Sequence, residues 1–212
     1  MKKNIIFTVL VCVAVVVAVM AGFMYRLSQP RMLTDHELRE YGAMMLETPR
    51  RFSDFKFTDH RGEPFTREQL NGRWTLVFFG FTHCPDICPT TLATLNKVVA
   101  AMTEEERAAL QVVMLSVDPE RDTPDKLASY VPFFNADFIG LTGDQAQLLN
   151  LATQLGAVYT KVPLKGGDYT VDHSGNIVLI NPMGDYHGLF RPPFEEGSVR
   201  VALRSIMTGF RH

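Results

Sequence analysis

The first apolar segment of the chain is long enough to cross a membrane. Residues 5–25 contain no charged side chain and are flanked by Lys2, Lys3 and Arg26. As a helix rising about 1.5 Å per residue, this segment spans ~31 Å, which matches a bilayer hydrocarbon core of ~30 Å. A cleaved signal peptide is the alternative, with residues 19–21 as a small-residue cleavage site, but its apolar region usually measures only ~7–15 residues. The pattern therefore favours an uncleaved N-terminal transmembrane helix.

The remainder of the chain alternates between apolar runs of strand length and segments with helical spacing. Residues 73–81, RWTLVFFGF, are rich in β-branched and aromatic side chains and predict a buried central strand. Residues 90–102 place apolar side chains at helical spacing, with Pro89 in the first turn. By the same criteria we expect further strands at residues 111–117, 138–141, 176–181 and 186–190, hairpins at 52–65 and 159–171, and helices at 103–109, after Thr123, after Asp144 and at 196–207. This order predicts one α/β domain with a mixed sheet.

Length and charge limit the class of protein. The chain has 212 residues, 46% of them hydrophobic, and a formal net charge of −2. This length allows one domain with a sizeable core, and the near-neutral charge argues against nucleic acid as a partner. We expect a membrane anchor at residues 1–27, a polar tether at 28–50 and one folded domain at 51–212. Met44 and Met45 in the tether are interpreted as packing residues rather than as thioether ligands of a metal.

Two of the three cysteines lie four residues apart, just after the predicted central strand. Cys84 and Cys88 each precede a proline, which disfavours helical backbone at the preceding residue, so residues 84–88 are expected to form a loop. Cys88 would then lie close to the positive N-terminal end of the following helix, where a thiolate is favoured. The third cysteine, Cys12, lies within the membrane segment and is expected to be inert.

A thiol pair of this kind supports three kinds of chemistry. It can cycle between dithiol and disulfide, bind a thiophilic metal, or form a structural disulfide. Thioredoxin-type redox motifs have two residues between their cysteines, whereas three residues separate Cys84 from Cys88. Zinc generally requires four protein ligands, or three and a water, and the chain has no second cysteine pair. Two thiolates suit Cu(I), and an imidazole as third ligand would also admit Cu(II).

Three separated motifs, taken together, resemble those of the Sco/SenC family. They are FTHCPDIC followed by a proline at residues 81–89, VDPERDTP at 117–124 and VDHSG at 171–175. The resemblance covers roughly residues 50–210. It implies a membrane-anchored copper protein with a thioredoxin-like fold, a mixed central sheet flanked by helices, that helps to assemble the binuclear copper centre of cytochrome c oxidase. It also implies that Cys84 and Cys88 are thiolate copper ligands, that His173 is the imidazole ligand, and that Asp118 lies near the site.

Local considerations also favour His173 among the six histidines. His83 adjoins Cys84, and two adjacent side chains rarely both turn inward. His173 follows the predicted excursion at residues 159–171, which can fold over the cysteine loop, and Asp172 is expected to orient its ring. The remaining histidines are interpreted as surface or structural residues: His36, His60, His187 and His212.

Two further aspartates follow the strand at residues 111–117. Asp118 lies at the C-terminal end of this strand, as the cysteines do after theirs, and open α/β sheets bind ligands at that edge. We therefore expect Asp118 near the site. Asp122 is interpreted instead as part of a solvated turn, with ion pairing and helix capping.

The expected function is that of a copper metallochaperone. The reduced cysteine pair and His173 would bind Cu(I) or Cu(II) and deliver it to the copper-centre subunit of cytochrome c oxidase. Other copper chaperones and thiol reductants are further candidate partners. Lys2 and Lys3 favour a cytoplasmic N-terminus, so we expect a single-pass protein of a bacterial inner membrane whose domain faces the periplasm.

Two other functions remain open. One is a membrane-anchored thiol–disulfide oxidoreductase that reduces partner cysteines, which would make the protein an enzyme. The other is a peroxidase-like or redox-sensing protein.

Overall fold

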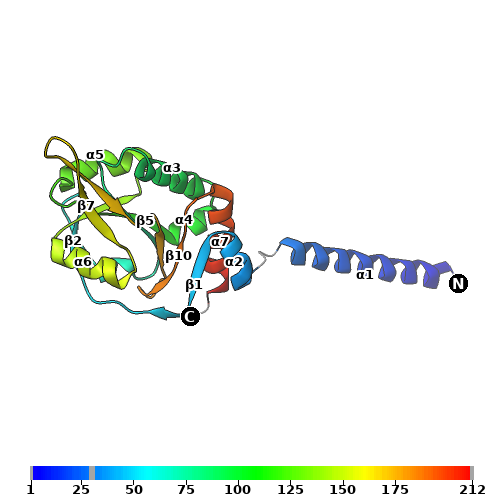
Figure 1. The fold of residues 1–212 in the computed structure, drawn as a ribbon. Coiled ribbons are helices and arrows are strands. Elements are labelled where there is room, and N and C mark those ends of the chain that lie inside the picture. Colours follow the sequence, from blue (N-terminus) through cyan, green and yellow to red (C-terminus); the bar gives the residue numbers. More distant parts are fainter. Residues whose placement is uncertain (1, 29–31, 211–212) are drawn as a thin grey trace.

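The computed structural model describes residues 2–28 and 32–210 of the chain (Figure 1). Arg31, His212 and a small part of the predicted tether lie outside the described residues. In chain order the elements are α1 (Lys2–Ser28), α2 (Asp35–Glu40), β1 (Ala43–Arg50), β2 (Lys56–Asp59), β3 (Pro64–Thr66), the 3₁₀ turn η1 (Arg67–Leu70), β4 (Trp74–Gly80), α3 (Ile87–Ala100), α4 (Glu104–Ala108), β5 (Leu110–Ser116), α5 (Pro124–Phe134), β6 (Ile139–Thr142), α6 (Gln145–Gln154), β7 (Tyr159–Pro163), β8 (Tyr169–His173), β9 (Ile177–Ile180), β10 (Tyr186–Phe190) and α7 (Glu196–Gly209).

A mixed eight-stranded sheet forms the centre of the domain, in the order β1-β10-β9-β4-β5-β6-β2-β3. The three strands β4, β5 and β6 are parallel, and every other pairing in the sheet is antiparallel. All residues of β4 and β5 are buried, as expected for apolar strands covered on both faces. The buried central strand predicted at residues 73–81 is therefore confirmed.

Helices cover both faces of this sheet. The crossovers from β4 to β5 and from β5 to β6 contain α3 and α5, which pack against each other, and α3 also packs against α7. On the face covered by α5, Gly140 of β6 lies against Leu127 and Val131 of α5. On the other face, Leu151 of α6 and Leu155, which follows α6, pack into a cluster of phenylalanines. The phenylalanines come from β2, β3 and the segment before β2, and side chains of β4 and β5 complete the cluster.

The N-terminal part of the domain is more ordered than its sequence indicates. Residues 43–50 fall within the predicted tether, yet they form β1, which pairs with β10 at one edge of the sheet. Ala43 is fully buried, and Leu38 of α2 is nearly so. Met44 and Met45 lie opposite Leu189 and Gly188 of β10, and Met45 packs against the hydrophobic core. Buried and exposed side chains do not alternate along β1, so its sequence lacks the alternation of apolar and polar residues by which a strand is predicted.

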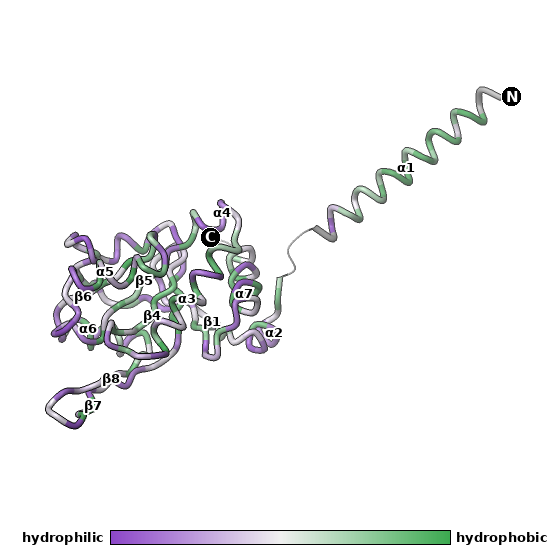
Figure 2. Tube along the Cα trace, turned by 90° about the horizontal axis from the view of Figure 1, so that it is seen from above, coloured by the Kyte–Doolittle hydropathy of each residue, from purple (hydrophilic) through white to green (hydrophobic). Residues whose placement is uncertain are grey.

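The hairpin of β7 and β8 does not belong to the main sheet. These two strands pair only with each other in a separate two-stranded sheet, and their hairpin extends from the body of the domain (Figure 2). Gly166 and Gly167 in the turn both have positive φ angles, of 94° and 88°, which glycine adopts without strain. The excursion predicted at residues 159–171 is thus confirmed.

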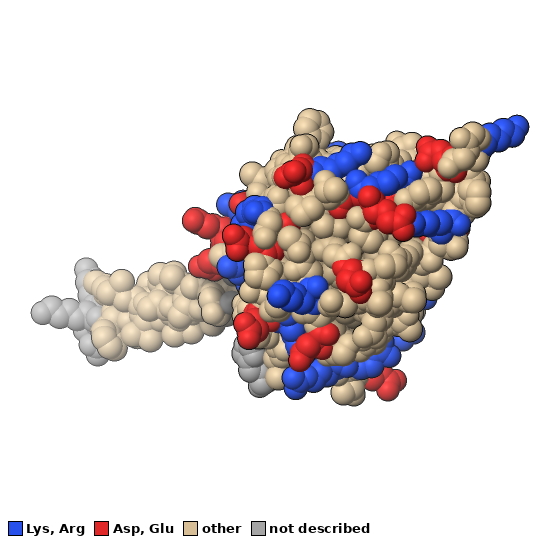
Figure 3. Space-filling model, turned by 90° about the vertical axis from the view of Figure 1, so that its left-hand side faces the viewer, with Lys and Arg blue, Asp and Glu red and all other residues tan. Residues whose placement is uncertain are grey.

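The helix α1 carries the apolar N-terminal segment. Ile5–Arg26 is long and apolar enough to cross a membrane by length and composition, and none of it is buried in the structure. Figure 2 shows this helix as a continuous apolar stretch outside the domain. On the face of the molecule seen in Figure 3, by contrast, basic and acidic side chains are interspersed over the surface of the domain.

Candidate metal centre

The cysteines lie where the central strand β4 ends and α3 begins. After β4 the chain turns, and the backbone N–H of Cys84 donates to the carbonyl of Phe81 at 3.3 Å. Cys84 lies in this turn as predicted, but α3 begins at Ile87, so Cys88 belongs to the first helical turn and its predicted loop conformation is wrong. Pro89 is tolerated there because the first N–H groups of a helix have no intrahelical partner.

The antiparallel direction of β9 brings His173 to the same edge of the sheet. In the register of β4 and β9, Phe78 lies opposite Ile177. Because the two strands run in opposite directions, the residues that follow Phe78 and those that precede Ile177 leave the sheet at one edge. His173, the last residue of β8, therefore lies against the turn that carries Cys84.

Three side chains converge at this edge. The ligand atoms of Cys84, Cys88 and His173 all lie within 4.8 Å of one another. The Cys88 Sγ is 3.5 Å from the His173 Nε2, and the Cys84 Sγ accepts the backbone N–H of Cys88 at 3.4 Å. In a trigonal site with metal–sulfur bonds of about 2.3 Å and metal–nitrogen bonds of about 2.0 Å, the corners are roughly 3.7–4.0 Å apart. The three groups could therefore hold a metal ion after only small shifts.

The ring of His173 is held from several sides. Its Nδ1 lies 3.1 Å from the carbonyl oxygen of Ser174, which leaves Nε2 directed to the sulfur of Cys88. The rings of Phe78 and Phe81 contact it edge-on, with centroids 5.9 and 5.8 Å away. Asp172 was expected to orient this ring, but its side chain is exposed, because successive residues of a strand face opposite sides. The carbonyl of Ser174 holds Nδ1 in its place.

The two thiols differ in acidity, in the opposite sense to the one expected. The pKa of Cys84 is lowered to about 3, chiefly because the Cys88 thiol donates a hydrogen bond to the Cys84 sulfur. The His173 ring and the backbone N–H of Cys88 lower this pKa further, whereas partial burial of Cys84 opposes the shift. The hydrogen bond from the Cys88 thiol to Cys84 and complete burial raise the pKa of Cys88. The N–H groups at the start of α3 point at Cys84 rather than at Cys88, so the thiolate predicted at Cys88 lies at Cys84.

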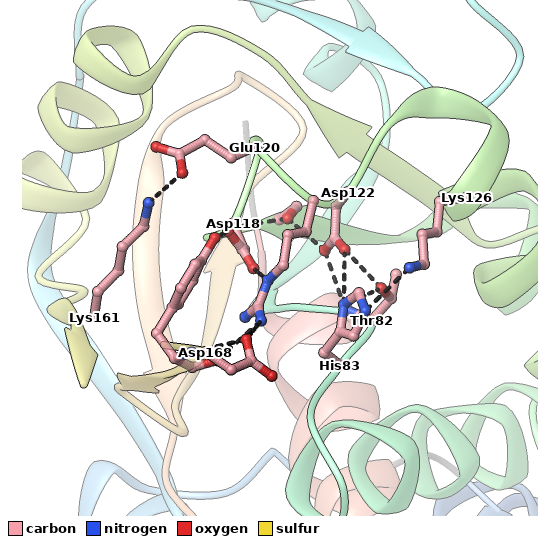
Figure 4. Close-up of polar contacts among 11 residues, drawn as sticks. Thr82, His83, Asp118, Glu120, Asp122, Lys126, Lys161 and Asp168 are labelled. Atoms are coloured by element: carbon pink, nitrogen blue, oxygen red, sulfur yellow. Dashed lines mark hydrogen bonds and ion pairs between the residues drawn. The ribbon is translucent and has the colours of Figure 1, made fainter. Parts of the chain in front are cut away.

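Two buried aspartates, Asp118 and Asp122, follow the end of β5 (Figure 4). Asp122 was interpreted as part of a solvated turn, but it is fully buried and accepts hydrogen bonds from both the N–H and the hydroxyl of Thr82. Thr123, not Asp122, caps α5. Asp118 is also fully buried, and its carboxylate pairs with Arg121 and accepts the hydroxyl of Tyr169 at 2.7 Å. Through Tyr169, its carboxylate contacts the strand that ends at His173.

The other described histidines lie elsewhere or face away from the sulfurs. The Nε2 of His83 lies 3.1 Å from the ammonium of Lys126, and its Nδ1 lies 3.3 Å from the hydroxyl of Thr82. His60 accepts the N–H of Gly140, His187 packs edge-on against Trp74, and His36 pairs with Glu40 on the surface.

One structural residue of the site was not anticipated from the sequence. A side chain at Gly80, the last residue of β4, would place its Cβ 2.7 Å from the Phe78 ring and 3.2 Å from the sulfur of Cys88. Glycine is therefore required here for close packing rather than for an unusual backbone angle. A glycine ending a central strand, four residues before a cysteine, is the sequence signal that could have identified it.

Comparison with known proteins gives a consistent family assignment. The SCO1/SenC family model matches residues 44–208. A protein of Stutzerimonas stutzeri, named as a candidate copper-binding protein, is 38% identical over 174 residues, covering 82% of this chain and 85% of its own. The human mitochondrial SCO2 homologue is 40% identical and covers 73% of this chain, which spans only 62% of the human protein.

A solved structure has the same architecture. The structure of Bradyrhizobium japonicum ScoI with copper bound is 37% identical in sequence and superimposes with a TM-score of 0.66, covering 72% of this chain and 97% of that protein. The predicted fold class, a thioredoxin-like mixed sheet flanked by helices, is thereby confirmed. Both the sequence match and the fold show that this chain is a member of the SCO1/SenC family.

Proposed function

We propose that this protein is a copper metallochaperone that holds one copper ion between Cys84, Cys88 and His173. The observation that carries the proposal is the convergence of two cysteine sulfurs and one imidazole nitrogen within 4.8 Å at an edge of the sheet. The copper-binding name of the Stutzerimonas relative and the copper in the Bradyrhizobium structure support this choice of metal.

The donor set itself favours copper. Two thiolates are soft ligands that select Cu(I), and the imidazole extends the site to Cu(II). A structural zinc site would need a fourth protein ligand. Within the described residues, Cys84, Cys88 and His173 form the one group of three or more ionisable donors that could hold a metal ion.

The exposure of the ligands suits transfer of copper. Cys84 and His173 are half-buried, whereas Cys88 is fully buried. An incoming thiolate could therefore exchange first with Cys84 or His173 while Cys88 still holds the ion. We propose the copper-centre subunit of cytochrome c oxidase as recipient, other copper chaperones as donors of the ion, and thiol reductants as the source of the reduced pair.

The proposed location is a bacterial inner membrane. Residues 1–27 would anchor the chain with the N-terminus in the cytoplasm, and the folded domain would face the periplasm. Since α2 and β1 are part of the fold, we propose a domain that begins near residue 32 and a correspondingly shorter tether.

Reduction of a partner disulfide is a second candidate function, favoured by the unequal acidity of the two thiols. The Cys84 thiolate would attack the partner disulfide and form a mixed disulfide, releasing one partner thiolate. Cys88 would lose its proton and attack the Cys84 sulfur, which releases the second partner thiol and leaves a Cys84–Cys88 disulfide. Two electrons pass to the partner, and an external thiol reductant would restore the pair.

Anaerobic copper titration of the reduced full-length protein in detergent tests the proposal. We expect the wild type to bind about one Cu(I) and to transfer it to an apo copper-centre domain. His173→Ala should weaken binding by at least about 100-fold, because loss of even an outer partner of a ligand costs ~10–100-fold in affinity. His83→Ala is the matched control and should bind as the wild type does.

The same variants separate the two candidate functions. A disulfide reductase requires Cys84 and Cys88 but tolerates His173→Ala. Copper affinity that is unchanged in His173→Ala would exclude the metal site as described, and reduction of an oxidised copper-centre domain by that variant would then favour the reductase.

A further inference from the structure

The loop of residues 118–122, which follows β5, contacts both halves of the metal site. We propose that this loop positions His173 relative to the two cysteines, with Asp122 holding the cysteine turn and Asp118 holding the hairpin that carries His173. This inference rests on the proposed copper site and identifies residues that determine its geometry. Figure 4 shows the two aspartates side by side, with Thr82 and His83 on one side and Asp168 and Lys161 on the other.

On the cysteine side, the contact runs through Thr82. The Asp122 carboxylate accepts the N–H of Thr82 at 3.0 Å and its hydroxyl at 2.6 Å. Thr82 lies two residues before Cys84, within the turn that leaves β4. Since Asp122 is fully buried, these hydrogen bonds do not compete with water and fix the course of the turn.

On the histidine side, the contact runs through Tyr169, the first residue of β8. Its hydroxyl donates to Asp118, and its backbone carbonyl accepts an N–H from Arg121 at 2.9 Å. The Arg121 guanidinium also lies over the Tyr169 ring, 3.8 Å from its centroid. At the paired strand β7, the Lys161 ammonium lies 2.7 Å from Glu120 of the same loop.

The loop couples its two ends through its own hydrogen bonds. The hydroxyl of Ser116 donates to Asp122 at 2.7 Å and accepts the N–H of Asp118 at 3.0 Å. The N–H of Asp122 in turn donates to the carbonyl of Asp118 at 2.9 Å. The Asp122 carboxylate is therefore tied through Ser116 to the backbone of Asp118, the residue that contacts the hairpin.

The hairpin needs such a support because no main-sheet strand holds it. Among the described strands, β7 and β8 pair only with each other. The chain connection to β9 fixes the His173 end of β8, so contacts with the rest of the domain must fix the direction in which the hairpin extends from there. Asp118 and Arg121 provide such contacts at Tyr169, the first residue of β8. His173 is the last residue of the same strand.

Tyr169→Phe tests the inference in the full-length protein in detergent, with Cu(II) as the probe. This change removes the hydroxyl that donates to Asp118 and keeps the ring over Arg121. We expect Cu(II) affinity to fall by about 10–100-fold, as for other residues that orient a metal ligand. The nitrogen hyperfine coupling of His173 in the electron paramagnetic resonance spectrum should weaken, while the sulfur-to-copper charge-transfer absorption remains.

Tyr159→Phe is the matched control on the same hairpin. Its hydroxyl bonds to Gln145 on the exposed surface, not to the loop, so we expect the wild-type affinity and spectrum. Thr82→Val is an independent variant for the cysteine side: it should lower affinity about tenfold and alter the sulfur absorption while the nitrogen coupling persists. Thermal unfolding of each copper-free variant shows whether its fold is retained.

The outcomes distinguish failure of this inference from failure of the proposed function. If His173→Ala abolishes the nitrogen coupling but folded Tyr169→Phe and Thr82→Val match the wild type, the loop does not position the ligands and the copper site stands. If Tyr159→Phe lowers Cu(II) affinity as much as Tyr169→Phe does, the position of His173 depends on any contact that anchors the hairpin and not specifically on the loop of residues 118–122. If His173→Ala leaves both affinity and coupling unchanged, the proposed site and this inference both fail.

Discussion

At the scale of single residues, Gly80 is packed too closely to accept a side chain. An added Cβ would lie 2.7 Å from the ring of Phe78, which is fully buried and cannot move aside without disturbing the core. We expect Gly80→Ala to lower the free energy of unfolding by about 1–3 kcal/mol and to weaken copper binding through Cys88. Chemical denaturation of the copper-free protein measures the first effect.

The chain offers a matched control for this change. A Cβ at Gly197, in the first turn of α7, would meet no atom within 4 Å. Gly197→Ala should leave stability unchanged or raise it by up to about 1 kcal/mol, because alanine is the better helix former. Equal stability of Gly80→Ala and the wild type would contradict the packing described at the end of β4.

The acidity of Cys84 predicts how its reactivity depends on pH. An ordinary thiol with a pKa of about 8.5 loses thiolate roughly tenfold per pH unit below that value, or about 10³-fold between pH 8 and pH 5. Because the pKa of Cys84 is lowered to about 3, it remains a thiolate over this whole range, and its alkylation rate should change little. Peptide mass spectrometry after timed alkylation locates the modified cysteine.

Unfolded protein is the control for this measurement. In denaturant the hydrogen bonds from Cys88 and His173 are lost, so Cys84 should recover the steep pH dependence of an ordinary thiol. A rate for native Cys84 that also falls about 10³-fold on acidification would show that Cys84 is not the thiolate of the pair.

At the scale of elements, α2 and β1 are needed for the stability of the sheet. β1 covers the edge of β10, Leu38 and Ala43 are buried, and the N–H of Leu33 donates to the hydroxyl of Ser205 in α7 at 2.6 Å. A chain that starts at residue 51, the boundary expected from the sequence, should lose at least about 3 kcal/mol relative to one that starts at residue 32. For a domain of this size that corresponds to a melting temperature roughly 6–12 °C lower.

Thermal unfolding and size-exclusion chromatography compare the two truncated chains. The shorter chain should also self-associate, since removal of β1 leaves β10 as an exposed edge that can pair with another copy. Two chains of equal melting temperature and size would show that β1 contributes no stability.

At the scale of the whole molecule, α1 should determine whether the protein behaves as a membrane protein. None of the apolar segment Ile5–Arg26 is buried against the domain, so in water its apolar surface would be exposed. We expect the full-length protein to resist alkaline extraction from membranes. Val16→Arg places a charge mid-span at a cost of about 2.5–3.5 kcal/mol and should reduce insertion, whereas Val16→Leu should not. Quantitative extraction of the wild-type protein by alkali would exclude an integral anchor.

Much of the fold follows from local sequence patterns. The central strand, the helix after the cysteines and the caps at Thr103 and Thr123 depend on residues only a few positions apart, so they could be predicted without knowledge of the rest of the chain. β1 could not, because its strand conformation depends on pairing with β10, which lies far along the sequence.

The metal centre likewise combines features that can be predicted from the sequence with features that depend on contacts between distant segments. The pair of thiols and their place after a central strand can be read from the residues alone, and resemblance of motifs adds His173 as their partner. How His173 reaches the thiols, which thiol is acidic and which groups hold them depend on the folded chain. The approach of His173 depends on the antiparallel pairing of β9 with β4, and the acidity of Cys84 depends on hydrogen bonds from Cys88 and His173. The burial of Asp122 depends on the packing of the cysteine turn against the end of β5. These are relations between segments distant in sequence, and they exist only once the chain has folded.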